Sequence, residues 1–267
     1  PQNIIVPRST DQALYIGIPL KDTDGNDTEN YPEGSLVWRT ENMPKRPEKG
    51  ADNMLKIMGD ARKAALDMRL VDQGYGDNPK SKIHEAANRI KALYDKWTPQ
   101  KGAQLVFIDL STPKAAKGKE AARIRELLAA AEGNDAAKAE AAQEQLDRMS
   151  PDEIDALNGD FSVYDDLKAK LIARGIPEAE IAFIHDANTE LQKDELFGRV
   201  RSGRVRVLFG STAKMGAGMN VQNRLVGLHH MDAPWRPSDL EQREGRIERQ
   251  GNQHDEIDIF AYATEGS

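Results

Sequence analysis

From Gly102 onward, short apolar runs alternate along the chain with segments of helical apolar spacing, and this alternation constrains the fold more than any other feature. The first run, AQLVFIDL at 103–110, is apolar almost throughout, which is typical of a strand buried on both faces of a parallel sheet. Further strands are predicted at 181–186, 205–211, 224–232 and 256–263, and helices at 161–176, 189–203 and 238–250. The alternation predicts an α/β fold, a doubly wound parallel sheet with helices on both faces.

One segment interrupts this alternation. Residues 114–150 are rich in Ala, Glu and Lys, which favours one or two helices of low sequence complexity. We expect a helical insertion at about 112–160, because the segment at 161–176 has the pattern of the crossover helix that the first strand requires. Ligands on such sheets bind at the carboxyl ends of the strands, and the Gly-rich segment GSTAKMGAGMN directly follows the strand at 205–211.

Residues 1–101 form a linker and helical segment that precedes the domain predicted for residues 102–267. The β-branched and aromatic content of 3–20 predicts one or two short strands, followed by a polar loop. Two helices are predicted, at 54–72 and 81–97. The second places an apolar face on one side, made by Ile83, Ala86, Ile90, Leu93 and Tyr94.

Composition sets the broad class of protein. The 267 residues are 39% hydrophobic, which is enough for a sizeable core, and no apolar run reaches membrane-spanning length. The absence of cysteine favours a cytoplasmic protein, and the first residue, Pro1, suggests a processed chain or a fragment. The net charge is −7, which argues against a surface that coats nucleic acid. Residues 196–253 nevertheless contain ten Lys and Arg against five Asp and Glu, so the positive charge is expected to lie with the motifs of this segment.

The stretch QREGRIERQGN carries two arginines on one side of the helix predicted at 238–250. Ser238 and Glu241 have the spacing of a capping box at its start, and Gly251 closes its end. Leu240 and Ile247 fall on the apolar stripe. The roughly opposite side groups a polar set, Gln242, Gly245, Arg246 and Arg249. A solvated basic face is one interpretation, and an anion site is the other, since guanidinium groups grip phosphate oxygens and a glycine allows close approach.

Two adjacent histidines and an aspartate end the strand at 224–232. His229 and His230 point to opposite faces of a strand and have no third ligand nearby, so packing or surface roles are favoured over a metal site. Asp232 could hold a nearby arginine or cap a loop.

The order of these motifs resembles a known family. A strand, STAKMGAGMNVQ, a second strand and MDAPWRPSDLEQREGRIERQGN follow one another as the fifth and sixth conserved motifs do in superfamily 2 helicases, above all in their chromatin-remodelling and DNA-translocase branch. QLVFIDL resembles the fourth motif, and NIIVPRSTDQALY is similar to the end of the first lobe in that branch. The chain therefore resembles the C-terminal RecA-like lobe of such a helicase, and it is similar to phage and plasmid proteins that are often fused to a DNA methylase.

The resemblance implies a role for each matched residue. Arg246 and Arg249 match the arginine fingers, which stabilise charge on the γ-phosphate across the interlobe cleft. A set near the nucleotide is implied, made by Gln242, Gly245, Gly218 and Asn220. A second set is implied for the nucleic-acid backbone, made by Ser211, Thr212, Lys214 and Gly216. Lys214 and Met215 stand where the family usually has smaller residues, and Trp235 matches an aromatic that packs or stacks.

The chain lacks two parts that an ATPase of this class needs, a phosphate loop and a Mg²⁺-binding acidic motif. Its one Gly-Lys pair, Gly118-Lys119, precedes Glu120 and has no phosphate-loop spacing. Two DEID strings, at 152–155 and 255–258, do not follow a strand as the Mg²⁺-binding acidic motif should. ATP and Mg²⁺ are therefore expected to be bound mainly by the missing first lobe, and the chain alone is expected not to hydrolyse ATP.

The resemblance implies the partners as well. One partner is the N-terminal helicase lobe of the same polypeptide. The other is DNA, double-stranded in preference to single-stranded, with RNA left open. A fused methylase domain is a further partner, and no membrane is expected. The first hypothesis is the second motor lobe of an ATP-dependent DNA helicase or translocase. The alternative is a non-catalytic module, derived from a motor domain, that binds nucleic acid or protein. A dinucleotide-binding oxidoreductase is disfavoured, because no acidic ribose partner follows GAGMN at the expected distance.

Overall fold

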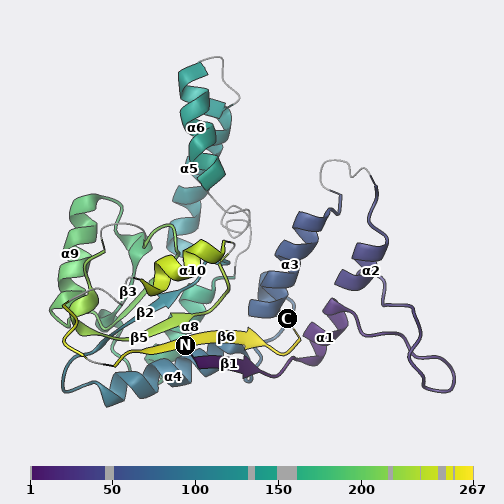
Figure 1. The fold of residues 1–267 in the computed structure, drawn as a ribbon, viewed down its shortest axis with the longest axis horizontal. Helices are drawn as coiled ribbons and strands as arrows, with labels where there is room; N and C mark the ends of the chain where they lie inside the picture. The colour runs from purple at the N-terminus through teal and green to yellow at the C-terminus, as the bar shows by residue number, and fades with distance from the viewer. Residues whose placement is uncertain are drawn as a thin grey trace.

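The described residues form one parallel sheet covered by helices on both faces (Figure 1). The computed structural model describes residues 2–45, 51–131, 136–148, 161–215, 219–234, 236–245, 251–254 and 256–266. The strands are β1 Gln2–Val6, β2 Ala103–Phe107, β3 Ile181–Phe183, β4 Val207–Gly210, β5 Leu225–His230 and β6 Asp258–Thr264. Their order across the sheet is β1-β6-β5-β2-β4-β3, and every neighbouring pair is parallel. The predicted α/β class with a doubly wound parallel sheet is confirmed.

Strand β2 lies at the centre of the sheet, and its side chains alternate between two hydrophobic cores. Leu105 and Phe107 pack on one face with α9, and Val106 packs on the other face with α4 and α8. Successive side chains of a strand point to opposite faces, so a strand covered on both faces must be apolar at almost every position. All five β2 residues are buried, which is why the sequence shows a run with no polar alternation.

Most of the helices were predicted from the sequence. They are α1 Thr10–Ile16, α2 Leu36–Glu41, α3 Met54–Leu66, α4 Lys82–Lys96, α5 Lys114–Ala131, α6 Ala136–Arg148, α8 Val163–Ala173, α9 Glu190–Arg201 and α10 Pro237–Glu244. Short 3-10 turns are η1 Met68–Leu70, η2 Glu178–Glu180, η3 Ile184–Asp186 and η4 Gln222–Arg224. The predicted face of α4 is confirmed, since four of its five members are buried and Tyr94 packs against the same core. Among the described residues, no helix is long and apolar enough to cross a lipid bilayer.

Two segments predicted to form strands continue as helical structure. The segment at 3–20 gives only β1, and its second half forms helix α1, because Ser9 accepts from the backbone of Gln12 while the Gln12 side chain accepts from the backbone of Ser9. This capping box starts a helix where the β-branched content suggested a strand. The strand predicted at 181–186 ends at Phe183, and η3 follows it.

The segment before Gly102 shares the sheet and the core with the residues after it. Strand β1 pairs with β6 as an edge strand, and Thr264 at the end of β6 donates to the carbonyl of Ala65 at 2.7 Å. Helices α1, α2 and α3 lie beyond the carboxyl ends of β1 and β6 (Figure 1). The division of the chain into domains at Gly102 stays a prediction, but it does not separate two sheets.

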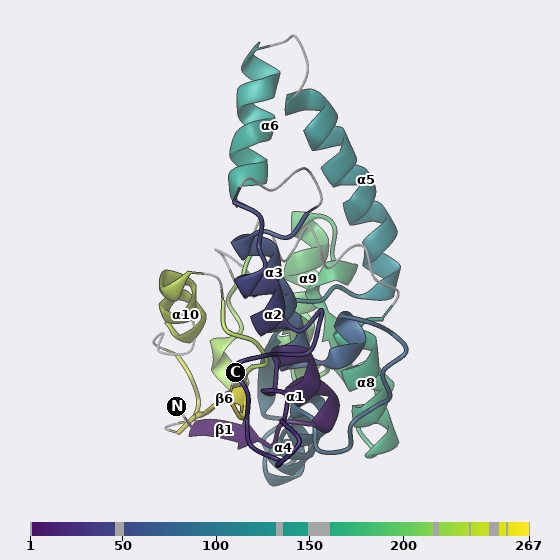
Figure 2. The same cartoon turned by 90° about the vertical axis from the view of Figure 1, so that its right-hand side faces the viewer.

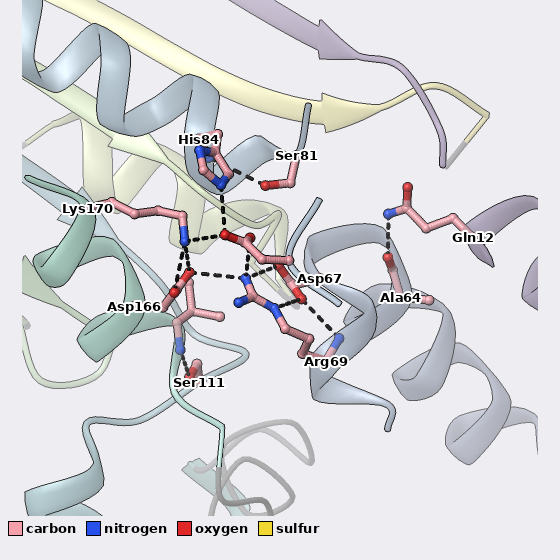
Figure 3. A network of polar contacts seen from close by, with 11 residues as sticks. Gln12, Ala64, Asp67, Arg69, Ser81, His84, Ser111, Asp166 and Lys170 are labelled. Atoms are coloured by element: carbon pink, nitrogen blue, oxygen red, sulfur yellow. Dashed lines mark hydrogen bonds and ion pairs between the residues drawn. The ribbon is translucent and has the colours of Figure 1, made fainter. Parts of the chain in front are cut away.

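A polar network also ties η1 to helix α8 (Figure 3). The Arg69 guanidinium donates to Asp67 at 2.8 Å and to Asp166 on α8 at 3.0 Å, and Lys170 donates to the same Asp166 at 2.9 Å. The Arg69 side chain is largely buried, so these bonds are shielded from water and hold the amino-terminal segment against the sheet's helical layer.

Helices α5 and α6 form a hairpin that projects away from the sheet (Figures 1 and 2). This is the helical insertion expected at about 112–160. The DEID string at 152–155 lies outside the described residues. Helix α8 follows as the predicted crossover helix.

Candidate functional site

Three polar side chains meet where the central strands end. Asp109 follows β2, Thr212 follows β4 and Asp232 follows β5. The backbone N–H and the hydroxyl of Thr212 donate to Asp109 at 2.7 and 2.8 Å, and the backbone N–H of Asp109 donates to Asp232 at 2.7 Å. Because all strands run in parallel, these groups gather at the carboxyl edge of the sheet, where α/β proteins place their ligand sites.

Arg243 of helix α10 binds all three groups. Its side chain is fully buried, and its Nη2 lies 2.6 Å from Asp109 Oδ2 and 3.4 Å from Asp232 Oδ1. Its Nε donates to the Thr212 hydroxyl at 2.7 Å, and its Nη1 donates to the carbonyl of Asp232 at 3.0 Å. We refer to Arg243, Asp109, Thr212 and Asp232 as the arginine clasp. A guanidinium offers five donors in a fixed plane, which suits one side chain bridging several acceptors.

Burial changes the protonation of the groups around Arg243. Burial raises the pKa of Asp232, and the nearby negative charge of Asp109 raises it further. Burial and the positive charge of Arg243 lower the pKa of His230 to about 3. His230 is therefore neutral at pH 7, and its Nδ1 must accept the N–H that Arg243 offers at 3.3 Å, because a guanidinium cannot accept.

The anchoring of α10 differs from the sequence prediction. Helix α10 begins at Pro237 after Arg236 and has no side-chain cap, so Ser238 lies inside the first turn and is not the N-cap. The predicted apolar stripe is also wrong at Leu240, which is 38% exposed. The buried residue that fixes this helix is Arg243, so α10 is held to the sheet by charge and hydrogen bonds.

The predicted arginine fingers lie outside the described residues, as do Gly216, Gly218 and Trp235. Helix α10 ends at Glu244 with Gly245 as its C-cap, whose φ of −60° and ψ of −7° are still helical. Gly245 therefore follows the helix and does not interrupt it, and Arg246 is the next residue along the chain. Gln242 lies within α10, beside Arg243.

The other predicted site residues follow β4. Ser211 is buried, and its hydroxyl accepts from the backbone of Lys214 at 3.2 Å. Lys214 is half-buried, and Asn220 is exposed, with its carbonyl accepting from Arg201 at 3.0 Å. Thr212 is buried and its hydroxyl is engaged by Asp109 and Arg243, so this residue has an internal bridging role besides the nucleic-acid contact predicted for it.

His229 has a packing role. Its two ring nitrogens lie 2.8 Å from the Tyr262 hydroxyl and 2.9 Å from Gln104 Oε1, and burial lowers its pKa to about 3. No group of three or more His, Cys, Asp or Glu side chains within the described part of the chain is arranged to hold a metal ion.

Sequence reasoning missed Arg243. Helical spacing places Arg243 on the side of Leu240 and Ile247, away from Arg246 and Arg249, but a charged residue was not expected to be buried. A second signal was the expectation that Asp232, at the end of its strand, could hold a nearby arginine.

The sequence matches one family model around this site. Residues 160–251 match the helicase conserved C-terminal domain, and they include Thr212, Asp232 and Arg243 of the clasp. This segment is therefore similar to the helicase conserved C-terminal domain. No curated protein sequence matches the chain significantly.

The chain is also similar to solved helicase structures. It matches a Dbp5 variant from S. cerevisiae bound to RNA and ADP BeF3 with 16% identity and a TM-score of 0.39, over 68% of this chain and 33% of that chain. It matches the C-terminal part of the Fun30 ATPase domain with 13% identity and a TM-score of 0.41, over 87% of this chain and 61% of that chain. It matches the Hef helicase domain of Pyrococcus furiosus with 11% identity and a TM-score of 0.37, over 79% of this chain and 30% of that chain. The chain spans about a third of the length of the Dbp5 chain.

Proposed function

We propose that the chain supplies the second motor lobe of an ATP-dependent DNA helicase or translocase. The observation that carries this proposal is the arginine clasp, which joins the ends of three central strands to helix α10 inside the segment that matches the helicase family. The chromatin-remodelling branch, the phage or plasmid origin and the fused methylase belong to this proposal and rest on the motif order alone.

The clasp gives the proposed motor a way to couple its two ligands. Thr212 belongs to the segment proposed to touch the nucleic-acid backbone, with Ser211, Lys214 and Gly216 beside it. Arg243 precedes the proposed fingers, Arg246 and Arg249, by three and six residues. Since Arg243 donates to Thr212 at 2.7 Å, a displacement of either segment is transmitted to the other through one buried side chain.

The nucleotide would lie between this lobe and the first one. Arg246 and Arg249 would meet the γ-phosphate, with Gln242, Gly245, Gly218 and Asn220 around it, because planar guanidinium groups bind phosphate oxygens in pairs. Mg²⁺ would be held by the first lobe. Asp109 and Asp232 do not suit it, since backbone N–H groups and Arg243 already occupy their oxygens. The remaining partner is DNA, duplex in preference to single strands, with RNA as a competitor to be tested.

The test is DNA-stimulated ATP hydrolysis by the full-length protein that contains both lobes. An Arg246→Ala, Arg249→Ala double variant is compared with the wild type and with Arg236→Ala, a matched control that removes an exposed arginine at the start of α10. Loss of an arginine finger lowers kcat by roughly 10³ to 10⁵-fold, and we expect a loss of this order in the double variant and none in the control. Stimulation at the wild-type rate in the double variant contradicts the finger assignment. A wild-type protein that binds DNA but never hydrolyses ATP favours the non-catalytic binding module.

A further inference from the structure

The amino-terminal edge of the sheet, opposite the clasp, carries an unusual concentration of positive charge. Three segments lead into β2, β4 and β5 there, at 96–102, 199–206 and 220–225, and we call them loops although they include the ends of α4 and α9 and the turn η4. They contain seven Lys and Arg and no Asp or Glu. With these charges set aside, the net charge of −7 becomes −14 for the rest of the chain. In Figure 1, strand β6 points to the right, so this edge lies toward the left.

The three loops form one continuous surface, because arginines from one loop bind carbonyl groups of another. Arg224 donates to the carbonyls of Gln100 at 2.6 Å and Arg201 at 2.8 Å. Arg206, which is buried, donates to the carbonyls of Gly102 at 3.1 Å and Tyr94 at 2.7 Å. We call the exposed and half-exposed members of this surface the basic face: Lys96, Lys101, Arg199, Arg201, Arg204 and Arg224.

Few carboxylates offset this charge. Arg201 lies 3.5 Å from Asp194, whose side chain is 78% exposed. Asp95 is paired with Lys91, and Glu180 accepts from the Tyr94 hydroxyl. The carbonyl bonds fix the directions of the guanidinium groups but leave their charge in place. Like charges held together repel one another, so the arrangement is most favourable when an anion lies over it.

The location of this charge corrects the sequence expectation. Five of the ten Lys and Arg in 196–253 lie in these loops and not beside the motifs at the carboxyl edge: Arg199, Arg201, Arg204, Arg206 and Arg224. The motifs therefore account for only the other five of these positive charges.

We propose that the basic face is a second binding surface for the phosphate backbone of nucleic acid, separate from the segment after β4. Arginine and lysine bind phosphates without reading bases, so the contact is independent of sequence. The composition favours nucleic acid over an acidic protein. None of the exposed large hydrophobic side chains lies in these loops, whereas a protein interface has an apolar core and a nucleic-acid interface is polar and basic.

The test measures binding of the full chain to a fluorescent DNA duplex of about 20 base pairs at several salt concentrations, by anisotropy. The variant Lys101→Asn, Arg204→Gln removes two exposed charges that make no ion pair with any described residue. Asn is used at position 101 because φ there is +52°, which Asn tolerates. The matched control, Lys45→Gln, Lys80→Gln, removes the same charge from exposed positions elsewhere.

The expected result is a salt dependence that changes in the variant alone. Loss of two phosphate contacts lowers the slope of log affinity against log salt by about 2, which at about 0.1 M salt is roughly a 60-fold loss of affinity. The control should have the wild-type slope. In the Arg246→Ala, Arg249→Ala background, the basic-face substitutions should lower the slope by the same amount, so the outcome is independent of the finger assignment. A thermal midpoint equal to that of the control shows that the variant is folded.

Three results overturn the proposal. The first is an equal slope of log affinity against log salt in the variant and the control. The second is a wild type that fails to bind the duplex even at about 0.05 M salt. In a parallel arm with poly-glutamate of the same charge as the duplex, loss of poly-glutamate binding with unchanged duplex binding assigns the basic face to an acidic polypeptide.

Discussion

Replacing Arg243 by alanine tests the arginine clasp. The substitution removes a fully buried guanidinium and leaves Asp109 and Asp232 without their counter-charge. Breaking a buried ion pair by removing one partner costs about 3–5 kcal/mol. Both carboxylates keep backbone N–H donors, which holds the cost within that range. At about 2–4 °C for each kcal/mol in a domain of this size, the thermal midpoint should fall by about 6–20 °C.

The cost should also depend on pH. Burial already raises the pKa of Asp232, and removal of Arg243 raises it further. A carboxyl with a raised folded pKa contributes stability below its unfolded pKa and loses it as pH rises through the folded pKa. The alanine variant should therefore be destabilised more at about pH 8 than at about pH 5, because at the lower pH a buried carboxyl takes up a proton and its uncompensated charge disappears.

Urea unfolding at both pH values measures the free-energy cost, and thermal unfolding measures the midpoint, each followed by circular dichroism. Arg236→Ala is the matched control, since Arg236 is exposed just before the same helix and its loss should change the free energy of unfolding by about 0.5 kcal/mol or less. A cost below about 1 kcal/mol for Arg243→Ala, or one that is equal at the two pH values, refutes the view that this charge cluster fixes α10.

Two further substitutions test burial elsewhere in the fold. Lys82 is 5% exposed, and burial lowers its pKa to about 8, so its charged form destabilises the fold below that pH. The substitution Lys82→Met should therefore raise the free energy of unfolding by about 1–3 kcal/mol at pH 7 and by less above about pH 10. Urea titrations across this pH range check it, and an equal gain at all pH values contradicts it. Gly210 leaves no room for a methyl group, because an added Cβ would lie 2.4 Å from Met215. The substitution Gly210→Ala should lower the free energy of unfolding by about 1–3 kcal/mol, measured by thermal denaturation. An unchanged thermal midpoint would show that this close approach is absent.

The sheet was predictable because its signal is local. The run at 103–107 is apolar at nearly every position, and its short length favours a strand covered on both faces over a buried helix. Helix α1 was not predicted although Ser9 and Gln12 have capping-box spacing, because composition was weighed above the cap.

The site was less predictable because it depends on residues far apart in the sequence. Arg243 is buried only because Asp109, 134 residues away, and Asp232 meet it at the carboxyl edge of the sheet. Helical periodicity places Leu240 and Arg243 on the same side of one helix, and it does not show that the apolar residue is partly exposed and the charged one buried. The basic face was not foreseen for the same reason, since three separate loops come together only when the strands are aligned.

The most direct test of the proposed motor function separates chemistry from nucleotide binding. In single-turnover hydrolysis by the full-length protein with duplex DNA bound, Arg249→Ala should lower the rate of ATP cleavage by roughly 10³-fold or more, while the Kd for ATP stays within a few-fold of the wild-type value. A wild-type cleavage rate in this variant, or a loss confined to ATP affinity, would contradict the assignment of this lobe as the donor of arginine fingers.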